Sequence, residues 1–200
     1  IFFAYTHFSN DLTTGLLVAL LPFIREDLDL NYLQAGFLVS AYSITAGFSQ
    51  LAGGWLSDRL SRKTGVALGL GGVGVSAMAI SLAHSYYGIF AMLVAMGVLA
   101  GFYHPSAVST LTNQFEEKRR GKVVAVHMIG GSLGFAFGPL IVALFVPLLA
   151  EKTTLVFLVP GAIAFALLVL GRHRISHPVA ATAAGGRPRG RSDVRGMTLL

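Results

Sequence analysis

Three ionisable side chains stand inside long hydrophobic stretches of this sequence, where a charge is costly to bury. His7 and Asp11 are four residues apart, so they share one face if their stretch is helical, and Asn10 lies beside them. His104 stands in a later apolar stretch and precedes Pro105, which kinks a helix and frees a backbone carbonyl. The pattern predicts that His7, Asn10, Asp11 and His104 form part of a pathway for protons or a small substrate.

Each of these polar residues also has a simpler interpretation. Asp11 could be a neutral, hydrogen-bonded group that holds helices together, and His104 could make an ordinary bond between helices. Gln50 and Tyr42 lie eight residues apart on roughly one face, so they could line the same pathway or bond neighbouring helices. His127 stands about one turn into its apolar stretch, which predicts a position at the membrane interface.

The stretches that carry these residues are long enough to cross a membrane. Of the 200 residues, 54% are hydrophobic and 12% are charged, and soluble domains carry about 25% charged residues. Continuous runs of this length favour transmembrane helices over barrel strands, and the absence of a persistent charged face disfavours a soluble helical bundle. We therefore predict an all-α membrane protein with six transmembrane helices, at 1–24, 32–56, 64–83, 88–112, 121–149 and 153–170.

The basic residues are distributed unevenly among the connections between these runs. Of 15 lysines and arginines, only Arg25 and Lys152 fall in the first, third and fifth connections, which leaves 13 for the other two and the C-terminal segment. Because basic connections stay in the cytoplasm, we expect both termini and the second and fourth connections there.

The C-terminal segment differs in composition from the rest. Residues 1–175 form the predicted membrane unit, and 176–200 are rich in Ala, Gly, Pro and Arg, which is typical of a flexible linker. The arginines of this linker suit anionic lipid headgroups. Nucleic acid is not expected as a partner, because no aromatic residues are interleaved with them.

Several chemistries have no counterpart in the sequence. It contains no cysteine and no Gly-Lys-Ser/Thr loop. We therefore expect no metal, no cofactor, no ATP-driven step and no enzymatic activity.

The second connection carries a known pattern. Residues 54–63, Gly-Trp-Leu-Ser-Asp-Arg-Leu-Ser-Arg-Lys, resemble the signature loop of the major facilitator superfamily: Gly, three residues, Asp-Arg, one residue, Gly, Arg, then Arg or Lys. Ser61 replaces the second glycine. The resemblance implies a cytoplasmic gate, in which Asp58 pairs with Arg120 of the fourth connection. The alternative is that the charges only set topology. The predicted gate residues are Gly54, Asp58, Arg59, Arg62, Lys63 and Arg120.

This resemblance also implies a fold and its partners. The six helices would form one half of the superfamily fold, built as a 3+3 inverted repeat. A second six-helix half of the same transporter, a small-molecule substrate and the lipid bilayer are the implied partners.

A glycine series in the run 121–149 predicts a close helix contact. Gly130, Gly134 and Gly138 are four residues apart and Pro139 follows, so the backbone of another helix can approach this stripe. The series resembles the glycine-rich helix of the superfamily's antiporters, although Val142-Ala143 replaces two further glycines.

Two other segments resemble a narrower group. His7-Phe8-Ser9-Asn10-Asp11 and Tyr103-His104-Pro105 together resemble the fosmidomycin-resistance branch, which consists of bacterial drug exporters driven by proton exchange. The resemblance implies proton-coupled efflux of small organic compounds across the bacterial inner membrane. Leu93 occupies the position of the arginine found in many proton-driven members. Import of a metabolite, or a receptor or scaffold without transport, are the alternatives.

Overall fold

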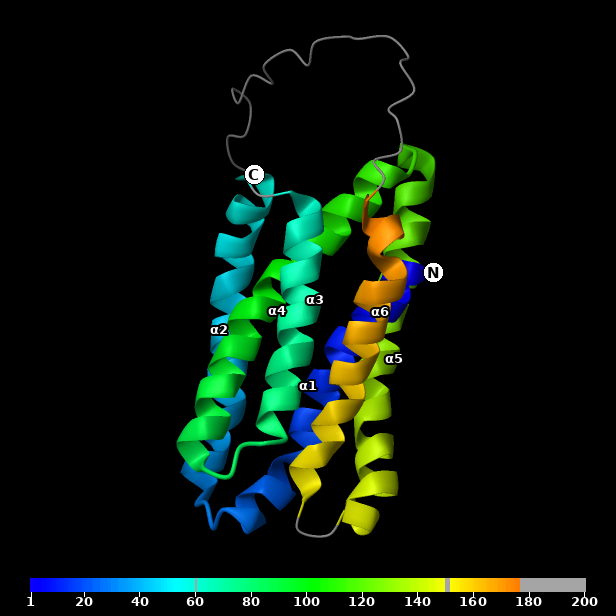
Figure 1. The fold of residues 1–200 in the computed structure, drawn as a ribbon. Coiled ribbons are helices and arrows are strands. Elements are labelled where there is room, and N and C mark those ends of the chain that lie inside the picture. Colours follow the sequence, from blue (N-terminus) through cyan, green and yellow to red (C-terminus); the bar gives the residue numbers. More distant parts are fainter. Residues whose placement is uncertain (60, 150–151, 177–200) are drawn as a thin grey trace, which may run out of the picture.

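The chain folds into six long α-helices packed side by side (Figure 1). The computed structural model describes residues 1–59, 61–149 and 152–176, with backbone alone for 56–58 and 172–176. A short 3-10 helix, η1, precedes the last α-helix. The helices are α1 (Phe2–Asp27), α2 (Tyr32–Arg59), α3 (Arg62–Ile80), α4 (Tyr86–Gln114), α5 (Glu117–Leu149), η1 (Thr153–Phe157) and α6 (Leu158–Ser176).

Length and composition fit a membrane. Among the described residues, α3, α4, α5 and the segment Thr153–Gly171 are long and apolar enough to span one. The helices α1 and α2, with 26 and 28 residues, are equally long but carry more polar side chains. Large apolar side chains are exposed along α2 and α5, from Phe37 to Trp55 and from Met128 to Leu148. A soluble monomer does not leave such surfaces uncovered, so this is a multi-pass membrane protein.

Polar side chains cap the starts of α2 and α3. Asn31 and Gln34 each accept a hydrogen bond from the other's backbone N–H, at 2.9 Å, at the start of α2. Ser61 caps α3 by accepting from the Thr64 N–H at 3.2 Å, in extended backbone with φ of −65°. The signature position of Ser61 therefore needs no glycine in this chain.

Most boundaries differ from the prediction by a few residues, and two of these differences change the environment of named residues. The helix α5 begins at Glu117 rather than at residue 121, so Lys118, Arg119 and Arg120 lie in its first turn and not in a loop. The predicted run 153–170 begins as 3-10 helix, and there the Thr153 hydroxyl donates to Asp27 Oδ2 at 2.7 Å. That bond holds the start of the last element against the end of α1.

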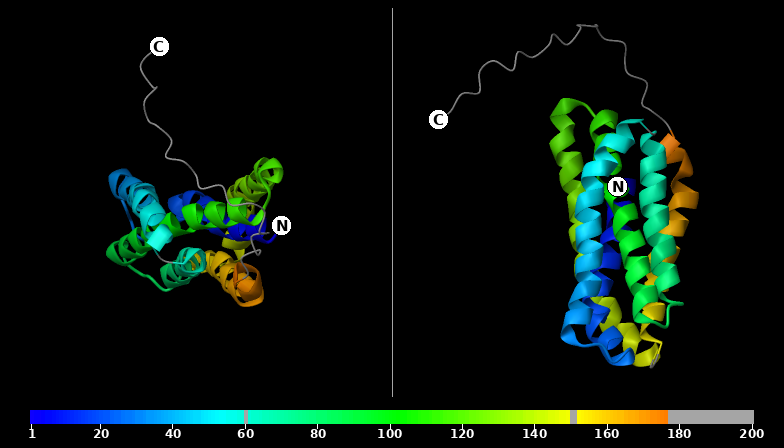
Figure 2. Two further views of the ribbon diagram at one scale, coloured as in Figure 1. Left: turned by 90° about the horizontal axis from the view of Figure 1, so that it is seen from above. Right: turned by 90° about the vertical axis from the view of Figure 1, so that its left-hand side faces the viewer.

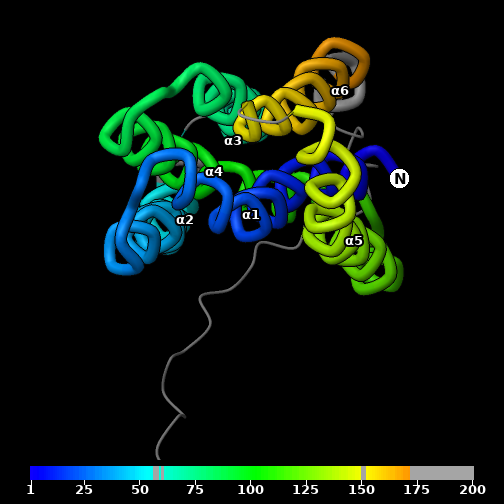
Figure 3. The backbone as a smooth tube through the Cα atoms, turned by 90° about the horizontal axis from the view of Figure 1, so that it is seen from below, coloured from blue at the N-terminus to red at the C-terminus, as the bar shows by residue number. Residues whose placement is uncertain are grey.

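The helices pair in a swapped pattern. In the view along the bundle, α1 lies beside α5 and α2 beside α4, while α3 lies between α4 and α6 (Figure 3). If α1, α2 and α3 correspond to α4, α5 and α6, the contact between α1 and α5 corresponds to the contact between α4 and α2. The two sets run in opposite directions, because each contains three helices that alternate in direction (Figure 2). This is the inverted 3+3 repeat that the sequence resemblance implies.

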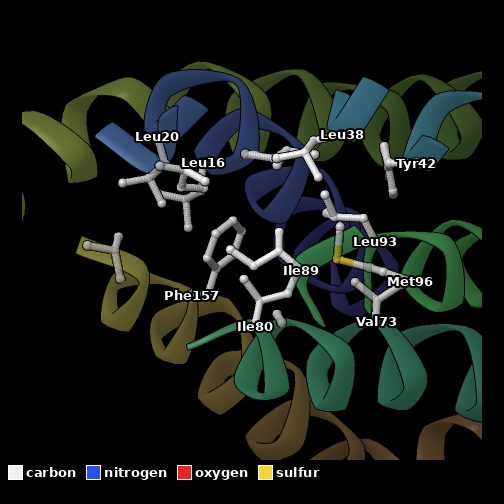
Figure 4. Close-up of a cluster of buried hydrophobic side chains, with 14 of the residues drawn as sticks. Leu16, Leu20, Leu38, Tyr42, Val73, Ile80, Ile89, Leu93, Met96 and Phe157 are labelled. Atoms are coloured by element: carbon white, nitrogen blue, oxygen red, sulfur yellow. The ribbon is translucent and has the colours of Figure 1, made fainter. Parts of the chain in front are cut away.

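Apolar packing holds the bundle at both ends. The larger buried cluster joins α1, α2, α3, α4 and η1, with Leu20, Leu38, Ile80, Ile89 and Phe157 among its members (Figure 4). A smaller cluster, which includes Phe3, Leu70, Tyr103 and Ala164, joins α1, α3, α4 and α6 near the other end. The connections α2–α3 and α4–α5 lie together at that other end (Figure 1).

Candidate functional site

A polar cluster lies where α1 meets α4 and α5. His7 and Asp11 stand one turn apart on α1, and His7 Nε2 lies 3.2 Å from Asp11 Oδ2. His7 is buried, whereas 27% of the Asp11 side chain is exposed. Tyr5, Phe8, Asp11, Thr14 and Val18 are the exposed or half-buried residues at three- to four-residue spacing along this part of α1. The carboxylate therefore lies on an open face of the bundle.

The hydrogen bonds of His7 fix where its protons lie. Its Nδ1 is 2.9 Å from the backbone carbonyl of His127 on α5. A carbonyl oxygen can only accept, so Nδ1 carries a hydrogen and donates. The other ring nitrogen then faces a carboxylate oxygen at 3.2 Å, and two lone pairs would repel each other there. A cation must join them, and a proton shared by His7 and Asp11 is the simplest one.

Asn10 connects this pair to α4. Its Nδ2 donates to Asp11 Oδ1 at 3.0 Å and lies 3.4 Å from His104 Nε2. The rings of His7 and His104 meet edge to face, with their centroids 5.1 Å apart. Asn10 is 1% exposed, and its Oδ1 is buried with no hydrogen-bond partner in the described part of the chain. The structure thus brings all four residues predicted from α1 and α4 into one cluster.

His127 also belongs to this cluster, although its sequence position did not predict this. We expected it at the membrane interface, but it is 1% exposed and its ring stacks on that of His7 with centroids 4.2 Å apart. Its Nδ1 donates to the Phe3 carbonyl at 2.8 Å. The ring of His127 therefore faces the interior of the bundle, against α1, and not the lipid-facing surface.

The Phe3 carbonyl is a second point where the three helices meet. The Thr6 hydroxyl donates to it at 3.0 Å, so Thr6 Oγ1 accepts from the Tyr103 hydroxyl at 2.7 Å. Tyr103 belongs to α4 and is fully buried. Together with the His127 bond, these contacts hold α1, α4 and α5 in register beneath the His7–Asp11 pair.

Gly131 on α5 leaves the space that the pair occupies. A Cβ atom there would lie 2.6 Å from both His7 Nε2 and Asp11 Oδ2. The sequence prediction chose the stripe of Gly130, Gly134 and Gly138 and passed over this neighbour. The doubled glycine at 130–131 was the available clue, because a four-residue stripe needs only one of the two.

The stripe itself carries the contact between α1 and α5. A Cβ on Gly130 would overlap the Ala4 backbone, one on Gly134 the Phe8 carbonyl, and one on Gly138 the backbone at Gly15. Pro139 lies within α5, directly after these glycines. The two backbones therefore touch directly at the level of the polar cluster.

The two polar residues predicted on α2 do not share one environment. Tyr42 is buried and its hydroxyl lies 2.8 Å from Thr14 Oγ1 on α1. Gln50 is exposed. Tyr42 therefore joins α2 to the face that carries Asp11, and Gln50 does not.

The predicted gate lies at the end of the bundle that carries the basic connections. The Asp58 side chain falls outside the described residues. Arg59 stacks on the Trp55 ring with its Cζ 3.8 Å from the ring centroid, and Arg120 Nε donates to the Phe115 carbonyl at 3.2 Å. Gly54 is half-buried on α2, and Arg62 and Lys63 are exposed in the first turn of α3.

Known proteins share both sequence and fold with this chain. The sequence model of the Major Facilitator Superfamily matches residues 3–196. The fosmidomycin resistance protein of Escherichia coli K12 is 20% identical over 163 residues, which cover 82% of this chain and 40% of that protein. The phosphoglycerate transporter protein of Salmonella typhimurium is 30% identical over 156 residues, covering 74% of this chain and 33% of the relative.

A solved structure agrees with these matches. A peptide transporter crystallised in complex with sulfate superposes with a TM-score of 0.75 at 20% identity, over 86% of this chain and 37% of that one. This likeness concerns the fold. The chain spans 33% to 40% of the length of the two relatives named above. From the family match over most of its length, this chain belongs to the major facilitator superfamily of membrane transporters.

Proposed function

We propose that this chain is part of a secondary active transporter of the bacterial cytoplasmic membrane, which exports small organic compounds in exchange for protons. The observation that carries the proposal is the His7–Asp11 pair. Its geometry requires a cation between Nε2 and Oδ2, and a proton meets that requirement. Asp11 is partly exposed on an open face, so the proton can be exchanged with a water-filled cavity there.

The open face needs a partner, because an ionisable group does not face lipid without cost. A second six-helix half of the same transporter would cover α1, α2 and α5 and close a cavity around Asp11 and His104. The chain's share of its relatives' length leaves room for such a half. Rocking of the two halves would expose the cavity to one side of the membrane and then to the other.

Export is favoured over import by the two segments around His7 and His104. They resemble the fosmidomycin-resistance branch, and a protein named for that resistance is among the relatives. Uptake of a small metabolite is the second candidate, because another relative is a phosphoglycerate transporter. A receptor or scaffold without transport is the least favoured alternative, since it would have no use for a proton shared on an open face.

The charged connection α2–α3 would serve as the cytoplasmic gate in this scheme. Asp58 would pair with Arg120 when the cavity faces outward, and the basic residues around it would hold this end in the cytoplasm. Gly54, Arg59, Arg62 and Lys63 belong to the same connection. Arg120 donates to a backbone carbonyl at the end of α4 in the present structure, so pairing with Asp58 would exchange one acceptor for another.

Transport in everted membrane vesicles tests the proposal. The full-length protein is expressed, a proton gradient is imposed, and movement of labelled fosmidomycin and of phosphoglycerate is followed. We expect the Asp11→Asn variant to lose at least tenfold in gradient-driven transport, because the amide cannot hold the shared proton. His84→Ala is the matched control, since His84 is exposed in the α3–α4 connection, far along the chain from the cluster.

Two results would overturn the proposal. Transport by Asp11→Asn at the rate of the control would remove the proton pathway from this pair. If the imposed proton gradient changes the transport rate neither in everted nor in right-side-out vesicles, transport is not coupled to protons. Accumulation of phosphoglycerate but not fosmidomycin would select the second candidate function.

A further inference from the structure

Two imidazoles and a carboxylate converge on one point between α1 and α4. One ligand-type atom from each of His7, Asp11 and His104 lies within 4.8 Å of the other two. We propose that these three residues, together with Asn10, form a binding site for a divalent transition metal ion of the zinc class. The inference goes beyond the proposed function, because it depends on the donor geometry and not on transport.

The distances are close to those of a tetrahedral site. Zinc bonds of 2.0–2.2 Å to nitrogen and oxygen place neighbouring ligand atoms roughly 3.4 Å apart. His7 Nε2 and Asp11 Oδ2 are already 3.2 Å apart. The ligand atom of His104 lies within 4.8 Å of the other two, so it needs to approach by at most about 1.4 Å, which a change of side-chain rotamer can supply. A metal ion between His7 Nε2 and Asp11 Oδ2 would also supply the positive charge that must lie between their two lone pairs.

The surroundings of His7 are those of a metal ligand. Its Nδ1 donates to the His127 carbonyl at 2.9 Å, which fixes the ring and leaves Nε2 free to coordinate. Metal-bound histidines almost always donate their second ring N–H in this way. Gly131 keeps the space around Nε2 clear of side-chain atoms from α5.

Asn10 supplies the fourth donor. In the present orientation its Oδ1 is buried with no hydrogen-bond partner among the described residues, and the amide nitrogen faces the cluster. The amide nitrogen lies 3.0 Å from Asp11 Oδ1 and 3.4 Å from His104 Nε2. Turning the amide by half a turn exchanges the nitrogen for the oxygen, which brings Oδ1 close to Asp11 and His104 and gives the cluster a fourth oxygen or nitrogen donor.

The donor set selects a class of metal. Two imidazoles suit Zn²⁺, Co²⁺ and Ni²⁺, whereas Mg²⁺ and Ca²⁺ prefer sites made of oxygen atoms alone. The chain has no cysteine, so the site would hold these ions less tightly than a thiolate site. The exposed part of Asp11 gives the ion a way in.

A bound ion would connect the two repeats of the chain. His7, Asn10 and Asp11 belong to α1, and His104 belongs to α4, so the metal would link helices that otherwise touch each other little. Such a link opposes any rearrangement that separates α1 from α4. An ion there would also take the place of the proton proposed between His7 and Asp11, so we expect Zn²⁺ to slow proton-driven transport and a chelator to restore it.

Cobalt binding to the purified full-length protein tests the inference. Co²⁺ is added to the protein in detergent, and the visible d–d bands of four-coordinate cobalt are recorded and then reversed with Zn²⁺. We expect one ion for each chain. Asp11→Asn and His104→Ala should each weaken binding at least tenfold, whereas His84→Ala should leave it unchanged, with folding checked by thermal unfolding.

The outcomes separate this inference from the proposed function. Absence of the bands, or binding that both cluster variants retain at full strength, would overturn the metal site. If the bands are absent while Asp11→Asn still abolishes proton-driven transport in the presence of a chelator, only the metal site fails. If cobalt binds at the cluster but Asp11→Asn transports normally without metal, the proposed function fails and the metal site stands.

Discussion

At the scale of single residues, the role of His7 is set by a carbonyl on another helix. Because the hydrogen on Nδ1 is donated to the His127 carbonyl, the contact between Nε2 and Asp11 depends on a second proton between these two atoms. The same carboxylate is contacted at its other oxygen by Asn10. The His7–Asp11 contact is therefore sensitive to a small shift of Nε2 or Oδ2, even when the backbone of both residues does not move.

Substitution of Gly131 supplies such a displacement. In Gly131→Ala the new methyl group would stand 2.6 Å from His7 Nε2 and Asp11 Oδ2, which are the far ends of side chains and can be pushed aside. We expect at least tenfold slower proton-driven transport with folding nearly intact. Gly121→Ala is the control on the same helix, because a Cβ there meets nothing within 4 Å.

The measurement is vesicle transport beside thermal unfolding of the purified variants. Normal transport by Gly131→Ala would show that the pair tolerates displacement and would contradict its proposed role. Loss of folding together with transport would leave the glycine a packing residue only.

Residue types alone were enough to predict four members of the cluster. His7, Asn10, Asp11 and His104 are conspicuous because polar groups are rare in apolar runs. His127 and Gly131 were not predicted, because their contribution is a backbone carbonyl and an empty space, which depend on how α5 lies against α1. The spacing of residues within one helix shows which of them share a face, but it does not show which residues of another helix that face contacts.

At the scale of helices, the α1–α5 contact depends on backbone meeting backbone. Gly134 faces the Phe8 carbonyl directly, and Gly15 on α1 faces Phe135 in return. The α2–α4 pair repeats the arrangement, with Gly101 against Ser49 and Gly53 against Gly101. Close approach by small residues is how membrane helices associate, since lipid offers no hydrophobic drive to pack.

A methyl group at Gly134 should therefore destabilise the bundle. A Cβ on Gly134 would meet the backbone of Phe8, which cannot change rotamer, whereas a Cβ on Gly131 would meet side-chain atoms. We expect Gly134→Ala to lower the free energy of unfolding by about 1–3 kcal/mol, the usual cost of overpacking. Gly121→Ala should be neutral or more stable by up to about 1 kcal/mol, because alanine favours helix. Unfolding of both variants in detergent by heat or denaturant measures the difference, and equal stability would contradict the packing role.

Helix number and order followed from the hydrophobic runs, whereas helix ends did not. The Ser61 cap begins α3 at Arg62, two residues before the predicted start, in polar sequence where hydropathy gives no guidance. The 3-10 start of the last element depends on the bond from Thr153 to Asp27, which joins residues far apart in the sequence. Pairing between helices was likewise beyond the sequence, because the repeat symmetry is not visible in the residues.

At the scale of the whole molecule, the fold separates a polar open face from two apolar clusters. The two basic connections lie at one end of the bundle (Figure 2), and the exposed carboxylate lies between the ends, on α1. The gate and the proton site that we propose would in this arrangement respond to the same motion of the bundle. The direction in which this molecule crosses the membrane then decides which side the gate closes.

Two serines allow that direction to be measured. Ser61 caps α3 in the basic connection, and Ser85 caps α4 at the opposite end, so both are exposed and have the same local role. The chain has no cysteine of its own, so Ser61→Cys and Ser85→Cys each introduce a single reactive thiol at matched structural cost. Because basic connections stay in the cytoplasm, we expect a membrane-impermeant maleimide to label Ser85→Cys in intact cells and to label Ser61→Cys only after permeabilisation. Labelling of Ser61→Cys in intact cells would reverse the orientation, and the gate that we assign to Asp58 and Arg120 would then close the outer side.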